Sequence, residues 1–202
     1  SLHLTNKYEA PDISCTLNAD FTGNNIDNLE GSITLDSLSF KTKPDSFFLK
    51  KFKVEATGHS LDRHLAITSD VLNGEVTGAY SFKTIGPSLM QTLKGYIPAL
   101  INVTQKKQKV MENNFSLLLT IENTEAISNT LKLPFTMLTQ GRITGHYNNL
   151  YNRFRFEAYL PKFNIDKSMF ESGYLTCDNP EDRVNLKLKA TNYNAKGLRN
   201  YM

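Results

Sequence analysis

Apolar and polar residues alternate one for one over long stretches of this chain. In residues 13–21, ISCTLNADF, every second residue is apolar: Ile13, Cys15, Leu17, Ala19 and Phe21. Because successive side chains of a β-strand point to opposite faces of a sheet, this pattern places all the apolar residues on one face. The sequence therefore predicts a mainly β fold whose sheet has one apolar and one polar face.

The same alternation recurs along most of the chain and predicts about ten strands joined mostly by short hairpins. In residues 31–40 it slips by one position, so that Leu38 and Phe40 continue the apolar phase of Ile33 and Leu35. A slip of this kind indicates a β-bulge at Ser37.

Two segments show a helical period instead. In the first, apolar residues recur at four-residue spacing: Leu89, Leu93, Ile97 and Leu100. This spacing predicts an amphipathic helix, which Pro98 should end or kink. Ile127 and Leu131 predict a short second helix, with Asn123 or Thr124 as its N-cap.

Two helices cannot cover the apolar face of so many strands. The sheet can therefore fold onto itself as a β-sandwich, close as a barrel, or remain a long, curled antiparallel sheet with a partly open groove. Alternation alone does not choose among these folds. We expect a single β-rich module over residues 1–202, or two related halves, 1–104 and 113–202, joined by a polar linker near 105–112.

Two nearly identical heptapeptides stand within this pattern. Residues 74–80 read GEVTGAY and residues 141–147 read GRITGHY. In both copies the two glycines lie on the apolar face of the expected strand: Gly74 and Gly78, and Gly141 and Gly145. Glycine within a strand allows a sharp bend or the close approach of another element. The repetition indicates equivalent positions in a repeated strand-rich module.

The chain shows no catalytic constellation. GHSLD, residues 58–62, resembles the nucleophile elbow of serine hydrolases, but Asp62 stands where that turn needs a glycine, so Ser60 is interpreted as part of a polar hairpin tip. The histidines and the two cysteines lack the spacing of metal ligands. We expect a protein that is not an enzyme, with no cofactor and no metal. Cys15 and Cys177 are expected to be buried free thiols.

Net charge and hydropathy limit the kinds of partner that we expect for this chain. The 202 residues include 23 basic and 20 acidic side chains, a formal net charge of +3, which does not indicate nucleic-acid binding. Apolar runs are shorter than the roughly 18 residues of a membrane helix, so no membrane span is expected within this segment. The chain begins in mid-pattern and without Met, which indicates a segment of a larger protein.

Three phrases carry a family resemblance. They are LEGSITLDSLSF (29–40), VLNGEVTGAYSFKTIGPSLMQTLKGYIP (71–98) and NNFSLLLTIENTEAISNTLKLPFTMLTQGRITGHYNN (113–149). Together they resemble the repeat-rich periplasmic region of TamB and AsmA-like proteins, the translocation and assembly module family. The resemblance covers residues 29–160. It rests on the alternating pattern and on the wording of these segments of sequence, and it includes no catalytic motif whose residues could be assigned here.

This resemblance implies a function and a cellular location. It implies a segment of a bridge protein in the periplasm of a Gram-negative cell, anchored in the inner membrane and engaging an outer-membrane barrel protein through parts not in this sequence. The cargo would be phospholipid acyl chains or other apolar molecules, in support of outer-membrane assembly, protein secretion or phospholipid transport. It further implies a β-taco, a curled sheet with an apolar lining.

Apolar residues in phase with the alternation are the candidate lining of the groove. They are Leu17, Phe21, Phe52, Val54, Val76, Phe82, Leu117, Leu119, Ile143, Phe154 and Phe156. The alternative is an adhesive or receptor-binding β-sandwich, in which the same residues form a dry core and loops carry the function. A small-ligand carrier built as a closed barrel is a third hypothesis.

Overall fold

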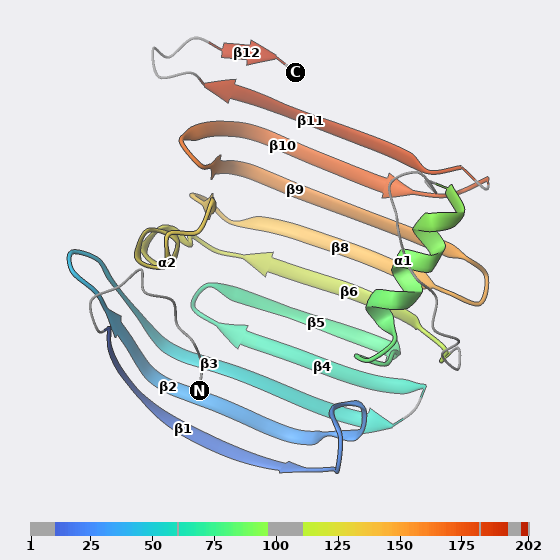
Figure 1. Ribbon diagram of the computed structural model, residues 1–202, viewed down its shortest axis with the longest axis horizontal. Helices are drawn as coiled ribbons and strands as arrows, with labels where there is room; N and C mark the ends of the chain where they lie inside the picture. Colours follow the sequence, from blue (N-terminus) through green and yellow to red (C-terminus); the bar gives the residue numbers. More distant parts are fainter. Residues whose placement is uncertain (1–10, 60, 97–110, 182, 194–198, 202) are drawn as a thin grey trace.

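The computed structural model describes residues 11–59, 61–96, 111–181, 183–193 and 199–201. The elements follow one another along the chain as labelled in Figure 1: β1 Asp12–Thr22, η1 Ile26–Asn28, β2 Glu30–Lys41, β3 Ser46–His59, β4 Asp62–Ser69, β5 Leu72–Ala79, α1 Ile85–Tyr96, β6 Asn114–Ile121, α2 Glu125–Leu131, β7 Phe135–Met137, β8 Gly141–Asn148, β9 Arg153–Ile165, β10 Ser168–Asp178, β11 Asn185–Tyr193 and β12 Arg199–Tyr201. The prediction of a mainly β fold with two helices is confirmed, with twelve strands.

All twelve strands belong to one antiparallel sheet. Its order follows the chain, β1-β2-β3-β4-β5-β6-β8-β9-β10-β11-β12, with β7 off this path. β7 and β8 lie end to end along the same side of β9, β8 against residues 153–159 and β7 against residues 163–165. Because β1 and β12 stand at opposite edges, the sheet is open. The β-sandwich alternative, and the closed barrel with it, is therefore wrong.

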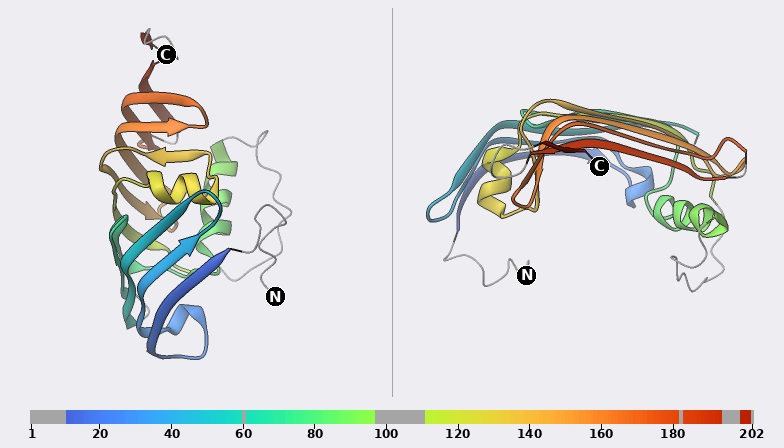
Figure 2. Two further views of the ribbon diagram at one scale, coloured as in Figure 1. Left: turned by 90° about the vertical axis from the view of Figure 1, so that its left-hand side faces the viewer. Right: turned by 90° about the horizontal axis from the view of Figure 1, so that it is seen from above.

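The sheet is curved into an arch, and both helices lie on its concave side (Figure 2). α1 lies at one end of the strands and α2 at the other (Figure 1). The outer strands β2 and β10 each contain a residue with left-handed backbone, Ser37 and Ser172 (φ 54° in both), beside a register shift against β1 and β11. Bulges of this kind bend and twist a strand, so they contribute to the curvature. The predicted bulge at Ser37 is confirmed.

The bulge at Ser37 also explains a wrong prediction in β3. In residues 47–57, FFLKKFKVEAT, two-residue alternation predicts Phe48, Phe52, Val54 and Ala56 on the apolar face, but Phe48 is 57% exposed. Beyond the bulge, β2 continues with Leu38 and Phe40, and these residues pair with Leu49 and Phe47. β3 must follow the phase of its neighbour to keep apolar side chains together, so its own alternation shifts by one residue.

Two further expectations concern the helices. α1 begins at Ile85 and is described to Tyr96, while Ile97, Pro98 and Leu100 lie outside the described residues, as do residues 97–110 with most of the expected linker. The division into two halves thus remains a prediction. α2 forms where expected, and Asn123 provides a side-chain acceptor at its start, since the Glu125 amide donates to Asn123 Oδ1 at 2.8 Å.

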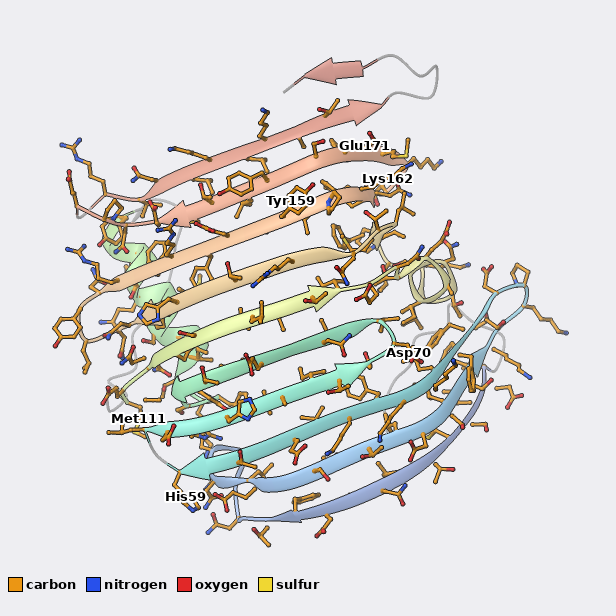
Figure 3. The ribbon with its side chains drawn as sticks, turned by 180° about the vertical axis from the view of Figure 1, so that it is seen from behind. His59, Asp70, Met111, Tyr159, Lys162 and Glu171 are labelled. Carbon is orange, nitrogen blue, oxygen red and sulfur yellow. The ribbon has the colours of Figure 1, made fainter. Side chains whose placement is uncertain are left out.

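The convex face of the sheet is polar (Figure 3). One row across ten strands consists of Asp20, Ser32, Glu55, Ala66, Glu75, Leu118, Thr144, Glu157, Thr176 and Lys187. Lys162 and Glu171, which lie side by side in Figure 3, form an ion pair at 3.6 Å. Exposed pairs of this kind contribute about 0 to 1 kcal/mol each. The convex face is therefore a solvated surface.

In the part of the chain that the structure describes, neither helix combines the length and the apolar character that crossing a bilayer requires.

Candidate functional site

The concave face carries two adjacent rows of side chains that cross the sheet from β1 to β11. The first row is Phe21, Gly31, Ala56, Leu65, Val76, Leu117, Gly145, Phe156, Cys177 and Leu186, and the second is Ala19, Ile33, Val54, Ile67, Gly74, Leu119, Ile143, Ala158, Leu175 and Leu188. Every member is aliphatic, aromatic, glycine or cysteine. We call these two rows the apolar stripe.

The apolar stripe is most open toward its two ends. Phe21 in β1 is 49% exposed, Ile33 in β2 is 38% exposed, and Leu188 in β11 is 69% exposed. Members in the central strands, such as Leu117 and Ile143, are partly buried. Apolar surface of this extent on the outside of a folded chain marks a site for an apolar ligand or partner.

α1 covers one end of the strands on the concave side of the sheet. Ile85, Leu89 and Tyr96 of α1 pack against a core of four buried aromatic residues: Tyr80, Phe115, Tyr147 and Phe154. Hydroxyl groups also attach the helix to the sheet. Ser88 Oγ and Thr92 Oγ1 lie 2.8 Å and 3.0 Å from the hydroxyl of Tyr147, whose side chain is fully buried.

The far end of α1 is attached in the same way. The side-chain nitrogens Nδ2 of Asn152 and Asn179 donate to the Tyr96 hydroxyl at 3.1 Å and 2.8 Å. Asn179 is buried, and its Oδ1 accepts from the Phe154 amide, so its side chain links α1 to the start of β9. Hydrogen bonds as well as apolar contacts therefore attach α1 to the sheet near both of its described ends.

α2 lies at the opposite end of the strands and is joined to β7. Met137 of β7 is fully buried, and the Met137 amide donates to Thr124 Oγ1 at the start of α2. Ser128 of α2, also buried, donates to the carbonyl of Phe135 at 2.9 Å. Phe163 in β9 packs against Phe135 with ring centroids 5.8 Å apart. On the concave side the two helices thus lie toward opposite ends of the strands, which the apolar stripe crosses.

The two heptapeptides lie on either side of β6, in β5 and β8. They are offset by two residues across it, so that Gly74 lies across Leu119 from Ile143, and Val76 lies across Leu117 from Gly145. Gly74, Gly78 and Gly145 thus each lie across β6 from a large residue of the other copy, whereas Gly141 lies across Ile121 from Leu72, which precedes the first copy. The closing tyrosines, Tyr80 and Tyr147, flank Phe115 in the core beneath α1.

The four repeated glycines meet different constraints. Gly78 has φ +117°, and a Cβ there would meet the Asn114 carbonyl oxygen. At Gly74 a Cβ would meet the Leu118 carbonyl and the Leu119 side chain. At Gly141 and Gly145 it would meet side chains of neighbouring strands, Met137 and Phe156 respectively. The predicted close approach of other elements is therefore observed at all four, through backbone in β5 and through side chains in β8.

A pocket opens on the concave face above β1 to β4. It has a volume of about 230 Å³ and is lined by Phe21, Leu29, Glu30, Gly31, Ser32, Ile33, Val54, Ala56, Leu65 and Phe82. Phe82 lies in the turn between β5 and α1 and Leu29 in the loop between η1 and β2. The remaining lining residues belong to strands, and four of the large apolar ones are members of the apolar stripe: Phe21, Ile33, Val54 and Leu65.

Seven of the predicted lining residues belong to the apolar stripe: Phe21, Val54, Val76, Leu117, Leu119, Ile143 and Phe156. Leu17 and Phe52 occupy the next row, where each pairs with Leu35. Phe82 lines the pocket, but from a turn, because β5 ends at Ala79. Phe154 is 4% exposed and belongs to the core beneath α1, so its placement in the lining is wrong.

Other members of the apolar stripe are not among the lining residues that the sequence predicted. None of the predicted lining residues lies in β4, β10 or β11. In these strands Ile67, Leu175 and Leu188 each stand two residues from another apolar residue, Leu65, Cys177 and Leu186 respectively, and that alternation is the signal that finds them. Each pairs directly with a residue already in the row. Strand order was needed to show that they form one continuous surface.

The cysteines differ from the expectation of two buried thiols. Cys177 is a partly buried member of the apolar stripe, whereas Cys15 is exposed. β1 is an edge strand, and every one of its residues is exposed in the part of the chain that the structure describes, whichever face it occupies. Burial raises the pKa of the Cys177 thiol, and the adjacent Asp178 carboxylate raises this pKa further. Both cysteines are free.

Among the described residues, no group of three or more His, Cys, Asp or Glu side chains is arranged to hold a metal ion. Ser60 of the GHSLD segment lies outside the described residues.

Comparison with known proteins found no matching family model, no matching curated protein and no matching solved structure.

Proposed function

We propose that this chain is a non-enzymatic module whose groove holds the acyl chains of phospholipids or other apolar cargo. The observation that supports this most strongly is the apolar stripe, two complete rows of apolar side chains that cross ten strands and remain partly exposed. A sheet face of this kind is unfavourable in water, and each large side chain shielded by a ligand would contribute up to roughly 1.5 to 3 kcal/mol.

The dimensions of the groove suit acyl chains. Neighbouring strands lie about 4.8 Å apart, so the nine steps from β1 to β11 span roughly 43 Å. A bilayer core of about 30 Å contains two layers of chains, so one acyl chain extends about 15 Å. Each buried methylene contributes about 0.8 kcal/mol wherever it lies along a uniform apolar floor. Chains can therefore bind at many equivalent positions and move along the groove.

The same proposal includes a cellular setting. The resemblance of residues 29–160 to TamB and AsmA-like proteins suggests a periplasmic segment of an envelope bridge that supports outer-membrane assembly, protein secretion or phospholipid transport. An outer-membrane barrel protein would be engaged by other parts of such a protein. The receptor-binding alternative depended on a dry core between two sheets, whereas the described strands all belong to one sheet.

Adjacent residues on opposite faces provide a matched test. Leu119 belongs to the apolar stripe, while Thr120 points to the convex face and pairs with Arg142. We expect phospholipid to co-purify with the unaltered chain and with Thr120→Glu, and to be reduced at least fivefold with Leu119→Glu, because a carboxylate on the groove floor opposes acyl binding. Lipid is measured by mass spectrometry after organic extraction, and circular dichroism checks folding. Equal lipid content in the two variants contradicts the proposal.

A further inference from the structure

The pocket above β1 to β4 has a wall that is fixed by polar contacts outside it. The Phe82 amide donates to Asp27 Oδ1 at 2.6 Å, and Ser81 Oγ donates to Asp27 Oδ2 at 3.0 Å. Asp27 belongs to η1, so these two bonds join the loop before β2 to the turn before α1. The Phe82 ring packs edge to face against Tyr80, with centroids 5.3 Å apart.

Arg63 supports the same wall from the sheet. Its side chain is 4% exposed, Nη1 donates to the Tyr80 carbonyl at 2.6 Å, and the guanidinium lies 4.4 Å from the centroid of the Tyr80 ring. Arg63 Nη1 is also 3.8 Å from Asp27 Oδ1. The buried cation and the nearby carboxylate thus balance each other, and neither belongs to the pocket lining.

This arrangement points to the class of group that the pocket accepts. Its lining side chains are mainly apolar, and Glu30 is the one charged residue among them. The Glu30 carboxylate lies 2.7 Å from His59 Nδ1, and Arg63 and Asp27 of the wall are engaged with each other, so a lipid headgroup would find little to bind there. A volume of about 230 Å³ suits on the order of eight methylene groups, if each takes about the 30 Å³ of a water molecule. The pocket is continuous with the apolar stripe through Phe21, Ile33 and Val54.

We propose that this pocket receives the terminal part of a single acyl chain whose remainder lies along the apolar stripe. The inference rests on the proposed function and makes it more specific, because it gives the groove one preferred site and one orientation of the chain. The carboxyl or headgroup end then lies away from Phe82. A phospholipid and a free fatty acid have the same chain chemistry, so either can fill the pocket.

The absence of tryptophan from the chain makes a direct test possible. Phe82→Trp and Leu29→Trp each place a single fluorophore in the pocket wall, and the second serves if the first does not fold. Leu188→Trp reports from the far end of the apolar stripe, and Tyr159→Trp from the exposed convex face shown in Figure 3. Each variant is titrated with stearic acid that carries a nitroxide quencher at carbon 5 or at carbon 16.

We expect quenching of the pocket reporters to be at least threefold stronger with the label at carbon 16 than at carbon 5, and to exceed quenching at Tyr159→Trp. Quenching at Leu188→Trp as strong as in the pocket, or stronger pocket quenching from carbon 5, overturns the inference and leaves the proposed function intact. Quenching of every reporter no greater than that of Tyr159→Trp overturns both.

Discussion

Gly78 is the residue at which the repeated heptapeptide most constrains the backbone. Its φ of +117° is unfavourable for any residue with a Cβ, and the added atom would meet the carbonyl of Asn114 in β6. We expect Gly78→Ala to lower the free energy of unfolding by about 1 to 3 kcal/mol, measured by urea denaturation. Gly86→Ala in α1 is the matched control, since open space surrounds that position and alanine favours a helix. Equal stability of the two variants would contradict this reading of the repeat.

Cys177 is a member of the apolar stripe, so the reactivity of its thiol can show whether a ligand covers the stripe. Because burial and Asp178 raise the pKa of its thiol, less of the reactive thiolate is present at a given pH. The rate of maleimide labelling should therefore increase with pH over a higher pH range than it does for an ordinary cysteine. In Cys15→Ser, we expect oleate to slow labelling of Cys177 severalfold. Cys177→Ser, which retains the exposed Cys15, should label at an unchanged rate. A Cys177 rate that oleate does not alter would indicate that chains bind elsewhere.

At the scale of elements, α1 depends on the Tyr147 hydroxyl. Its two partners, Ser88 and Thr92, lie in α1, and removing the hydroxyl leaves polar groups of a buried interface without their partner. We expect Tyr147→Phe to weaken docking of α1 by about 1 to 3 kcal/mol, seen as faster amide hydrogen exchange in α1 with little change in the central strands. Tyr151→Phe, at a residue that is 76% exposed, is the control. Unchanged exchange in α1 would show that apolar packing alone holds the helix.

Alternation predicted individual strands well and their ends less well. It placed Val76, Leu117 and Ile143 on one face because each lies in the middle of a regular strand. It failed at Phe48, whose phase is set by a bulge in the neighbouring strand. It found Phe82 as a lining residue but extended the strand pattern to it, whereas Phe82 lies in the turn after β5. Both errors arise because a local pattern contains no information about neighbouring elements.

At the scale of the whole molecule, the same alternation is compatible with a sandwich, a barrel or an open sheet. What distinguishes them is how far the sheet bends and whether its edges meet, and these depend on long-range pairing and on bulges at residues such as Ser37 and Ser172. The open sheet leaves β1 and β12 at separate edges.

The central claim is that the concave face, and not the convex face, contacts acyl chains. Leu188 and Lys187 are neighbours in the exposed part of β11, the first on the apolar stripe and the second on the convex face. A photoreactive benzoylphenylalanine is introduced at either position, cells are irradiated, and the mass of the purified chain is measured. The account predicts a phospholipid adduct at position 188 and at most a trace at position 187. Equal adducts at both positions, or an adduct at 187 alone, would contradict it.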